Sequence, residues 1–167
     1  EVRNVMFDGL ISWTICYGFK VGQAVADNQD NITFQNSVVY DGAVGIGIHH
    51  KAYQAAVTNV MFSNIDIERL SNSNDGNRTW LAFMINDQSN DGAGLISGVQ
   101  VRHITVRDRG TTAGKLTGFS TTSNISNVLF DSIRMSGSTT YATTLAEMNI
   151  TNRQFVTGVT IRPVPSN

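Results

Sequence analysis

The chain has 167 residues, 41% of them hydrophobic and 15% charged, which suits one domain with a sizeable core and a surface of neutral polar side chains. The formal net charge of −1 gives no electrostatic reason to expect nucleic acid or an acidic membrane as a partner. Cys16 is the only cysteine, which excludes an internal disulfide, and no stretch approaches the length of a membrane span.

The chain opens at Glu1 without a starting Met or a signal peptide, and it enters a strand-like run at residues 2–7. We therefore expect residues 1–167 to be a single domain from a longer protein that has already lost any export signal. We expect that protein to be secreted.

Internal repetition is the clearest pattern in the sequence. A four-residue phrase of the type Asn-Val-Met-Phe begins at residues 4, 31, 59, 98, 127 and 158, so the steps are 27, 28, 39, 29 and 31 residues. The copies that begin at residues 98 and 158 are weaker and start with Gly. The one long step predicts a loop insertion at residues 72–78 or 87–94.

Each full copy continues through a two-residue corner into a second short strand with alternating apolar residues. A third strand is expected at residues 18–21, 45–49, 79–85 and 117–120. Three short strands in a coil of about 28 residues are typical of a parallel β-helix, because each coil buries its inward side chains on its neighbours. We predict an all-β fold, a right-handed parallel β-helix (solenoid) of about six coils.

Other repeat folds fit less well, since the leucine-rich consensus is absent and the runs are β-branched with period two. Asn36 and Asn64 occupy equivalent corners of two coils. Their amides either stack and hydrogen-bond along the solenoid or act as local turn residues, and both interpretations stay open.

The outward positions of the third strands form a ladder that can line a cleft. Alternation places Lys20, His49, Trp80 or Met84, and Ser120 on this ladder, with small residues between them. An aromatic ring, a base and a hydroxyl on a flat strip suit a sugar chain, whose apolar faces stack on rings and whose hydroxyls need partners.

The predicted substrate-binding residues are therefore Lys20, His49 and Trp80, together with Tyr17 and Asp41. Each has a structural alternative: Trp80 can cover the core under the loop at residues 72–78, and Asp41 can be a turn residue. His49 and the adjacent His50 point to opposite faces of one strand and cannot share a metal ion without distortion. We predict no metal site and no cofactor.

Residues 18–21, 31–39, 45–48 and 57–65 resemble the central coils of the pectin-lyase-like β-helix superfamily. Within it, the chain is most similar to the dextranase/isopullulanase family and to the polygalacturonases. The resemblance implies the β-helix fold and an enzyme that hydrolyses a polysaccharide within its chain.

The catalytic residues of these families have no counterpart in this sequence. Cys16 and Tyr17 stand where the families place two adjacent aspartates. Residues 43–45 read Ala-Val-Gly in place of Gly-His-Gly, and residues 82–84 read Ala-Phe-Met in place of Arg-Ile-Lys. Hydrolysis of a glycosidic bond needs one carboxylic acid and one carboxylate. Three alternatives stay open: the acids lie before Glu1, a different set of residues in the cleft acts as catalyst, or the chain has no hydrolytic activity.

Two hypotheses about function follow. The first is a dextranase-like glycoside hydrolase, and the second is a non-catalytic carbohydrate-binding or structural β-helix module. Both have a polysaccharide or oligosaccharide as partner. We also expect a second chain or a missing segment to cover the Glu1 end, because a solenoid otherwise exposes an unpaired strand edge there.

Overall fold

The computed structural model describes residues 1–73 and 76–163, and every regular element in this part of the chain is a β-strand. Alternation of β-branched or aromatic residues with polar ones favours this, because such a strand buries one face. The strands are β1 (Val2–Asp8), β2 (Ile11–Trp13), β3 (Tyr17–Ala24), β4 (Gln29–Asp41), β5 (Val44–Ala52), β6 (Val57–Ile67), β7 (Thr79–Ile85), β8 (Ile96–Val106), β9 (Gly114–Thr117), β10 (Ile125–Met135), β11 (Ile150–Gln154) and β12 (Val156–Arg162).

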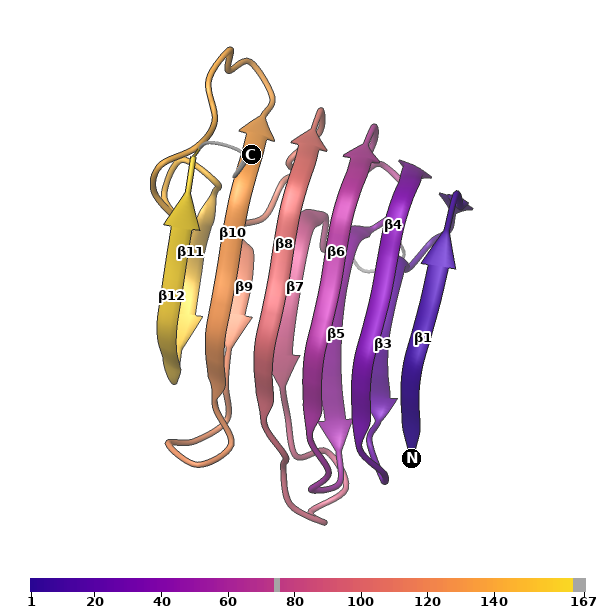
Figure 1. Ribbon diagram of the computed structural model, residues 1–167, viewed down its shortest axis with the longest axis vertical. Coiled ribbons are helices and arrows are strands. Elements are labelled where there is room, and N and C mark those ends of the chain that lie inside the picture. Colours follow the sequence, from indigo (N-terminus) through magenta and orange to yellow (C-terminus); the bar gives the residue numbers. More distant parts are fainter. Residues whose placement is uncertain (74–75, 164–167) are drawn as a thin grey trace.

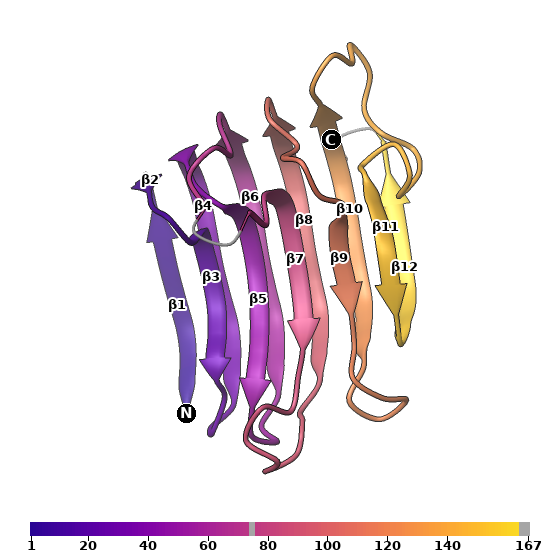
Figure 2. The same ribbon diagram turned by 180° about the vertical axis from the view of Figure 1, so that it is seen from behind.

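The strands form two parallel sheets that lie face to face (Figures 1 and 2). In spatial order the first sheet holds β1, β4, β6, β8, β10 and β12, with β2 also paired to β4, and the second holds β11, β9, β7, β5 and β3. The chain alternates between the sheets, so neighbouring strands in a sheet come from successive turns of a solenoid.

The path of the chain is right-handed. In Figure 1 the first sheet runs upward in front, the second runs downward behind, and the chain advances from right to left. Six rungs in the first sheet joined by five strands of the second make about five turns in the described residues, close to the predicted six. The prediction of a right-handed parallel β-helix is confirmed.

A column of side chains marks the interior. Phe7, Phe34 and Phe62 occupy the same position on β1, β4 and β6, and their ring centres are 4.6 Å and 5.6 Å apart in that order. The column continues through Val101 on β8 to Phe130 on β10. The predicted column is thus confirmed, and each turn buries its apolar row on the next.

The asparagine corners use both of the mechanisms that the sequence left open. Asn36 and Asn64 have positive φ angles of 50° and 53°, a left-handed conformation that asparagine tolerates. Nδ2 of Asn64 also donates to Oδ1 of Asn36 at 2.8 Å, and Nδ2 of Asn36 donates to Asp8 at 2.9 Å. A ladder of side-chain hydrogen bonds therefore runs along the solenoid at this bend.

Two long connections account for the 39-residue step. Residues 68–78 join β6 to β7 and residues 86–95 join β7 to β8, whereas residues 42–43 alone join β4 to β5. Both predicted insertion sites therefore lie in longer connections. Residues 74 and 75 of the first site are outside the described part of the chain.

The last of the predicted third strands is wrong in its position. β9 covers Gly114–Thr117 instead of residues 117–120, with Leu116 buried and Phe119 exposed. Because Leu116 fills the interior here, the outward place on the ladder belongs to Lys115. Ser120 lies beyond the end of the strand.

The first rung leaves apolar side chains exposed at the β1 end of the solenoid. They belong to Val2, Met6, Phe7, Leu10, Ile11, Trp13 and Ile15. The expectation that a second chain or another segment covers this end stays a prediction.

Candidate functional site

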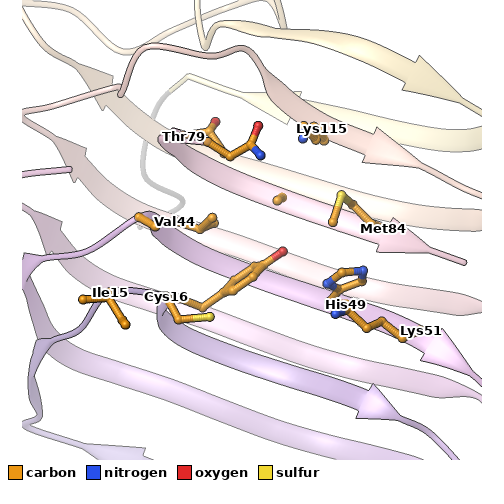
Figure 3. Close-up of a pocket in the computed structure, with 12 residues that line it drawn as sticks. Ile15, Cys16, Val44, His49, Lys51, Thr79, Met84 and Lys115 are labelled. Atoms are coloured by element: carbon orange, nitrogen blue, oxygen red, sulfur yellow. The ribbon is translucent and has the colours of Figure 1, made fainter. Parts of the chain in front are cut away.

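The outward face of the second sheet carries a groove of about 400 Å³. Figure 3 shows His49 and Lys51, Met84, and Lys115 projecting from three successive strands into it. Its lining residues are Ile15, Cys16, Tyr17, Ala43, Val44, His49, Lys51, Asn77, Thr79, Ala82, Met84 and Lys115.

Strand register sets the outward side chains in rows that run along the solenoid axis. The first row has a lysine at each end and two small residues between these lysines. Its members are Lys20, Gly47, Ala82 and Lys115. The neighbouring outward row consists of Gly22, His49, Met84 and Thr117. We call the side chains of Tyr17, Lys20, His49, Lys51 and Lys115 the basic strip.

Tyr17 supplies the aromatic surface of the basic strip. Its half-buried ring lies against Gly47 on the next strand, and a Cβ at position 47 would overlap this ring. The ring centre is 6.2 Å from that of His49 and 5.4 Å from Nζ of Lys20. Because Gly47 has no side chain, the Tyr17 ring can pack against this strand, between the imidazole of His49 and the ammonium group of Lys20.

His49 is half-buried on β5, and its Nε2 lies 2.9 Å from Oδ1 of Asn86, to which it donates. Burial lowers the pKa of His49 below its ordinary value, and the bond to Asn86 opposes this effect. The positive charges of Lys51, Lys20 and Lys115 lower the pKa further. The imidazole is therefore neutral at pH 7 and offers Nδ1 as an acceptor.

The predicted orientations of Lys20 and His49 are confirmed. Their neighbours Phe19, Val21 and Ile48 are buried in the core, and Lys20 and His49 face outward. Nζ of Lys20 donates to Oε1 of Gln23 at 2.7 Å while it lies over the Tyr17 ring. Whether these side chains contact a substrate stays a prediction.

The prediction that Trp80 faces outward is wrong. Its side chain is 0% exposed, its Nε1 donates to the carbonyl oxygen of Met148 at 2.6 Å, and its ring packs edge-on against Phe130 with centres 6.5 Å apart. Trp80 is a core residue in this structure and provides no platform for a sugar.

A bend in the strands explains the error. Gly18 and Gly45 hold the positions equivalent to Trp80 on β3 and β5, and a Cβ at either would meet a buried side chain, Val39 or Ile67. Two successive residues of each strand therefore face the interior at this level. Simple alternation places the first of them on the wrong side.

Asp41 does not reach the groove either. It is 3% exposed at the end of β4, where its carboxylate accepts the backbone N–H of Ser71 at 2.9 Å, the hydroxyl of Ser71 at 2.8 Å and Nε of Arg69 at 3.0 Å. Burial alone raises the pKa of Asp41, but the bonds from Ser71 and the charge of Arg69 outweigh it and leave the pKa below its usual value. Its observed role is to anchor the connection at residues 68–78.

Sequence reasoning missed Lys51, Lys115 and Asn77 in the groove. For the two lysines the sequence contained a signal. The chain has only three lysines, and Lys115 precedes the apolar Leu116, which predicts that the two side chains point to opposite faces of the strand. Asn77 comes from a connection whose path no periodicity indicates.

The groove offers a ring, hydrogen-bond donors and positive charge. None of its lining residues in the described part of the chain is Asp or Glu. Across residues 1–73 and 76–163, no three side chains of His, Cys, Asp or Glu gather in a way that could hold a metal ion. The same residues contain no helix long and apolar enough to cross a bilayer.

Fold and groove together define this chain as a parallel β-solenoid with a basic strip on one sheet. No protein-family model matches the chain, and no curated protein matches it. Membership of the pectin-lyase-like superfamily therefore stays a prediction from the resemblance of the coils.

Proposed function

We propose that the chain is a non-catalytic saccharide-binding β-solenoid and that the basic strip is its binding site. The observation that supports this most directly is the Tyr17 ring, which lies against Gly47 between His49 and Lys20. Sugar rings have apolar faces that stack on aromatic rings, and their hydroxyls need donors and acceptors at the edge of such a platform.

The length of the strip favours a polymer over a small molecule. Its rows cross four adjacent strands that are about 4.8 Å apart. Gly47 and Ala82 lie between the two lysines of one row and have little or no side chain to project from the sheet. An extended chain that runs along the solenoid axis would contact side chains from each of these four strands in turn.

A dextranase-like hydrolase, the other hypothesis from the sequence, has less support in the groove. Glycoside hydrolysis needs two carboxyl groups that flank the scissile bond, and the described lining provides none. Secretion of the protein also stays a prediction.

The test is a panel of soluble polysaccharides and oligosaccharides, both neutral and acidic, scored for binding and for release of shorter products. We expect binding without product release. Tyr17→Ala should weaken binding about two- to tenfold, the range for the loss of an aromatic contact. Tyr40→Ala, which removes an exposed ring from β4, is the matched control and should leave binding unchanged.

Three outcomes would overturn the proposal. Failure to bind any saccharide removes the function, and equal binding by the Tyr17→Ala and unmodified chains moves the site elsewhere. Release of products by the unmodified chain would restore the hydrolase hypothesis.

A further inference from the structure

Lys51 and Lys115 line the groove, and Lys20, the third lysine of the chain, lies beside it with its Nζ over the ring of Tyr17. The three lysines are 31 and 64 residues apart in sequence and come from β3, β5 and β9, so the fold alone brings them to one face. The positive charge of each lysine lowers the pKa of His49, in line with their placement on one face of the second sheet.

The lysines differ from the arginines in their partners. Five arginines of the described residues form ion pairs with acids, namely Arg3, Arg69, Arg102, Arg107 and Arg162. No ion pair between described side chains includes a lysine. A chain with a formal net charge of −1 therefore presents a local excess of positive charge above a groove whose described lining has no carboxylate.

We propose that the saccharide bound here is acidic and carries carboxylate, sulfate or phosphate groups that the three lysines contact; this inference rests on the proposed saccharide-binding function. Gathered ammonium groups repel one another across a shallow groove, and an anionic ligand relieves that repulsion while it satisfies their N–H donors. A neutral glucan would gain only the contacts with Tyr17 and His49.

The register also sets the length of the ligand. Lys20 and Lys115 share one row and are three strand steps apart, which is about 14 Å between their backbones. An acidic chain that lies along the solenoid axis contacts Lys20, Tyr17 and His49 toward the β3 end and Lys115 at the β9 end. Affinity should therefore rise with oligomer length and level off once both lysines are reached.

The experiment compares a polyuronate, a sulfated polysaccharide, a phosphorylated polysaccharide and a neutral α-glucan at increasing NaCl concentration. We expect at least one acidic polysaccharide to bind more tightly than the glucan, with an affinity that falls as salt rises. Lys20→Gln, Lys51→Gln and Lys115→Gln should each weaken that binding about two- to fivefold, the range for exposed ion pairs.

Arg134→Gln is the matched control, because it removes one positive charge from β10 in the other sheet, and it should leave the affinity unchanged. Oligouronides of graded length test the spacing between Lys20 and Lys115. Thermal unfolding of each variant separates loss of ligand contacts from loss of fold.

The results distinguish failure of the acidic-ligand inference from failure of the proposed saccharide-binding function. If neutral and acidic saccharides bind equally and without salt dependence, the strip binds sugars but the charge inference is wrong. If no saccharide binds, the proposed function fails as well. A single-stranded oligonucleotide that binds more tightly than every acidic saccharide would assign the lysines to a different polyanion.

Discussion

Trp80 and Met148 are 68 residues apart in the sequence, yet Nε1 of Trp80 donates a 2.6 Å hydrogen bond to the carbonyl oxygen of Met148. The bond joins β7 to the connection between β10 and β11, and Phe130 packs against the same indole. The tryptophan therefore links a middle turn of the solenoid to the segment near its C-terminal end.

Trp80→Phe should lower the free energy of unfolding by about 1–3 kcal/mol. The smaller ring leaves space in the core, and the carbonyl of Met148 loses its donor while it stays buried. Urea denaturation measures the change. Trp13→Phe, at an exposed position, is the control and should change the free energy by less than about 0.5 kcal/mol.

A similar effect from the Trp13 variant would mean that Trp80 has no special role in the core. Trp80→Phe should not change saccharide binding, since the Trp80 side chain is buried in the core and does not line the groove.

The sequence predicted the solenoid well because one physical requirement is repeated along it. Each turn must place an apolar residue over that of the previous turn, so Phe7, Phe34 and Phe62 recur at nearly even steps. Such a requirement is local to each turn and can be read without knowing the rest of the fold.

The site was predicted less well because it depends on departures from that repetition. Trp80 was misplaced because the strand bends inward beside it, and the sequence shows only a tryptophan that follows a threonine. Lys115 was missed because β9 begins three residues earlier than expected, which changes the side chains that face outward. Asp41 was assigned to the groove because its partner Ser71 comes from a connection with no periodic pattern.

Asp41→Asn should lower the free energy of unfolding by about 2 kcal/mol at neutral pH. The substitution removes the charge that strengthens the bonds from Ser71 and Arg69 in a buried place. Asp66→Asn is the control, since Asp66 pairs with Arg107 near the surface and such pairs contribute roughly 0–1 kcal/mol.

The acid limb of the pH profile tests the same carboxylate. The folded pKa of Asp41 lies below the unfolded value of about 3.9, so the unfolded chain binds the proton more readily. The stabilisation is thus complete above about pH 5, where the unfolded carboxyl is also ionised, and is lost as the pH falls through the lower folded pKa. Chemical denaturation from pH 5 to pH 2 should show a shallower loss for Asp41→Asn than for the unmodified chain, and equal slopes would contradict this assignment.

His50 should make stability depend on pH in a higher range. Its side chain is 0% exposed, and Nε2 lies 2.6 Å from the carbonyl oxygen of Ala55. Burial lowers the pKa of His50, and the bond to Ala55 opposes this effect only in part. The unfolded chain, with a histidine pKa of about 6.5, therefore binds more protons as the pH falls below that value.

The free energy of unfolding should consequently decrease as the pH is lowered from about 6.5 toward the folded pKa. His50→Asn should reduce this slope, whatever it does to the stability at pH 8. His103→Asn is a suitable control, because His103 is exposed and has a φ of 52°, a conformation that asparagine accepts. A slope that is the same in all three chains would show that His50 does not govern it.

Asn64 tests the ladder of amides, because its backbone conformation and its side-chain bond make separate contributions. Its φ is 53°, and its Nδ2 donates to Asn36 at 2.8 Å. Asn64→Gly keeps a residue that tolerates positive φ and loses only the bond, so it should cost about 1 kcal/mol of unfolding free energy. Asn64→Ala loses the bond and also strains the backbone, which should raise the cost to about 2 kcal/mol or more. Urea denaturation of the two variants separates the effects: equal losses would mean that the left-handed conformation carries no strain, and no loss in the glycine variant would mean that the ladder does not stabilise the solenoid.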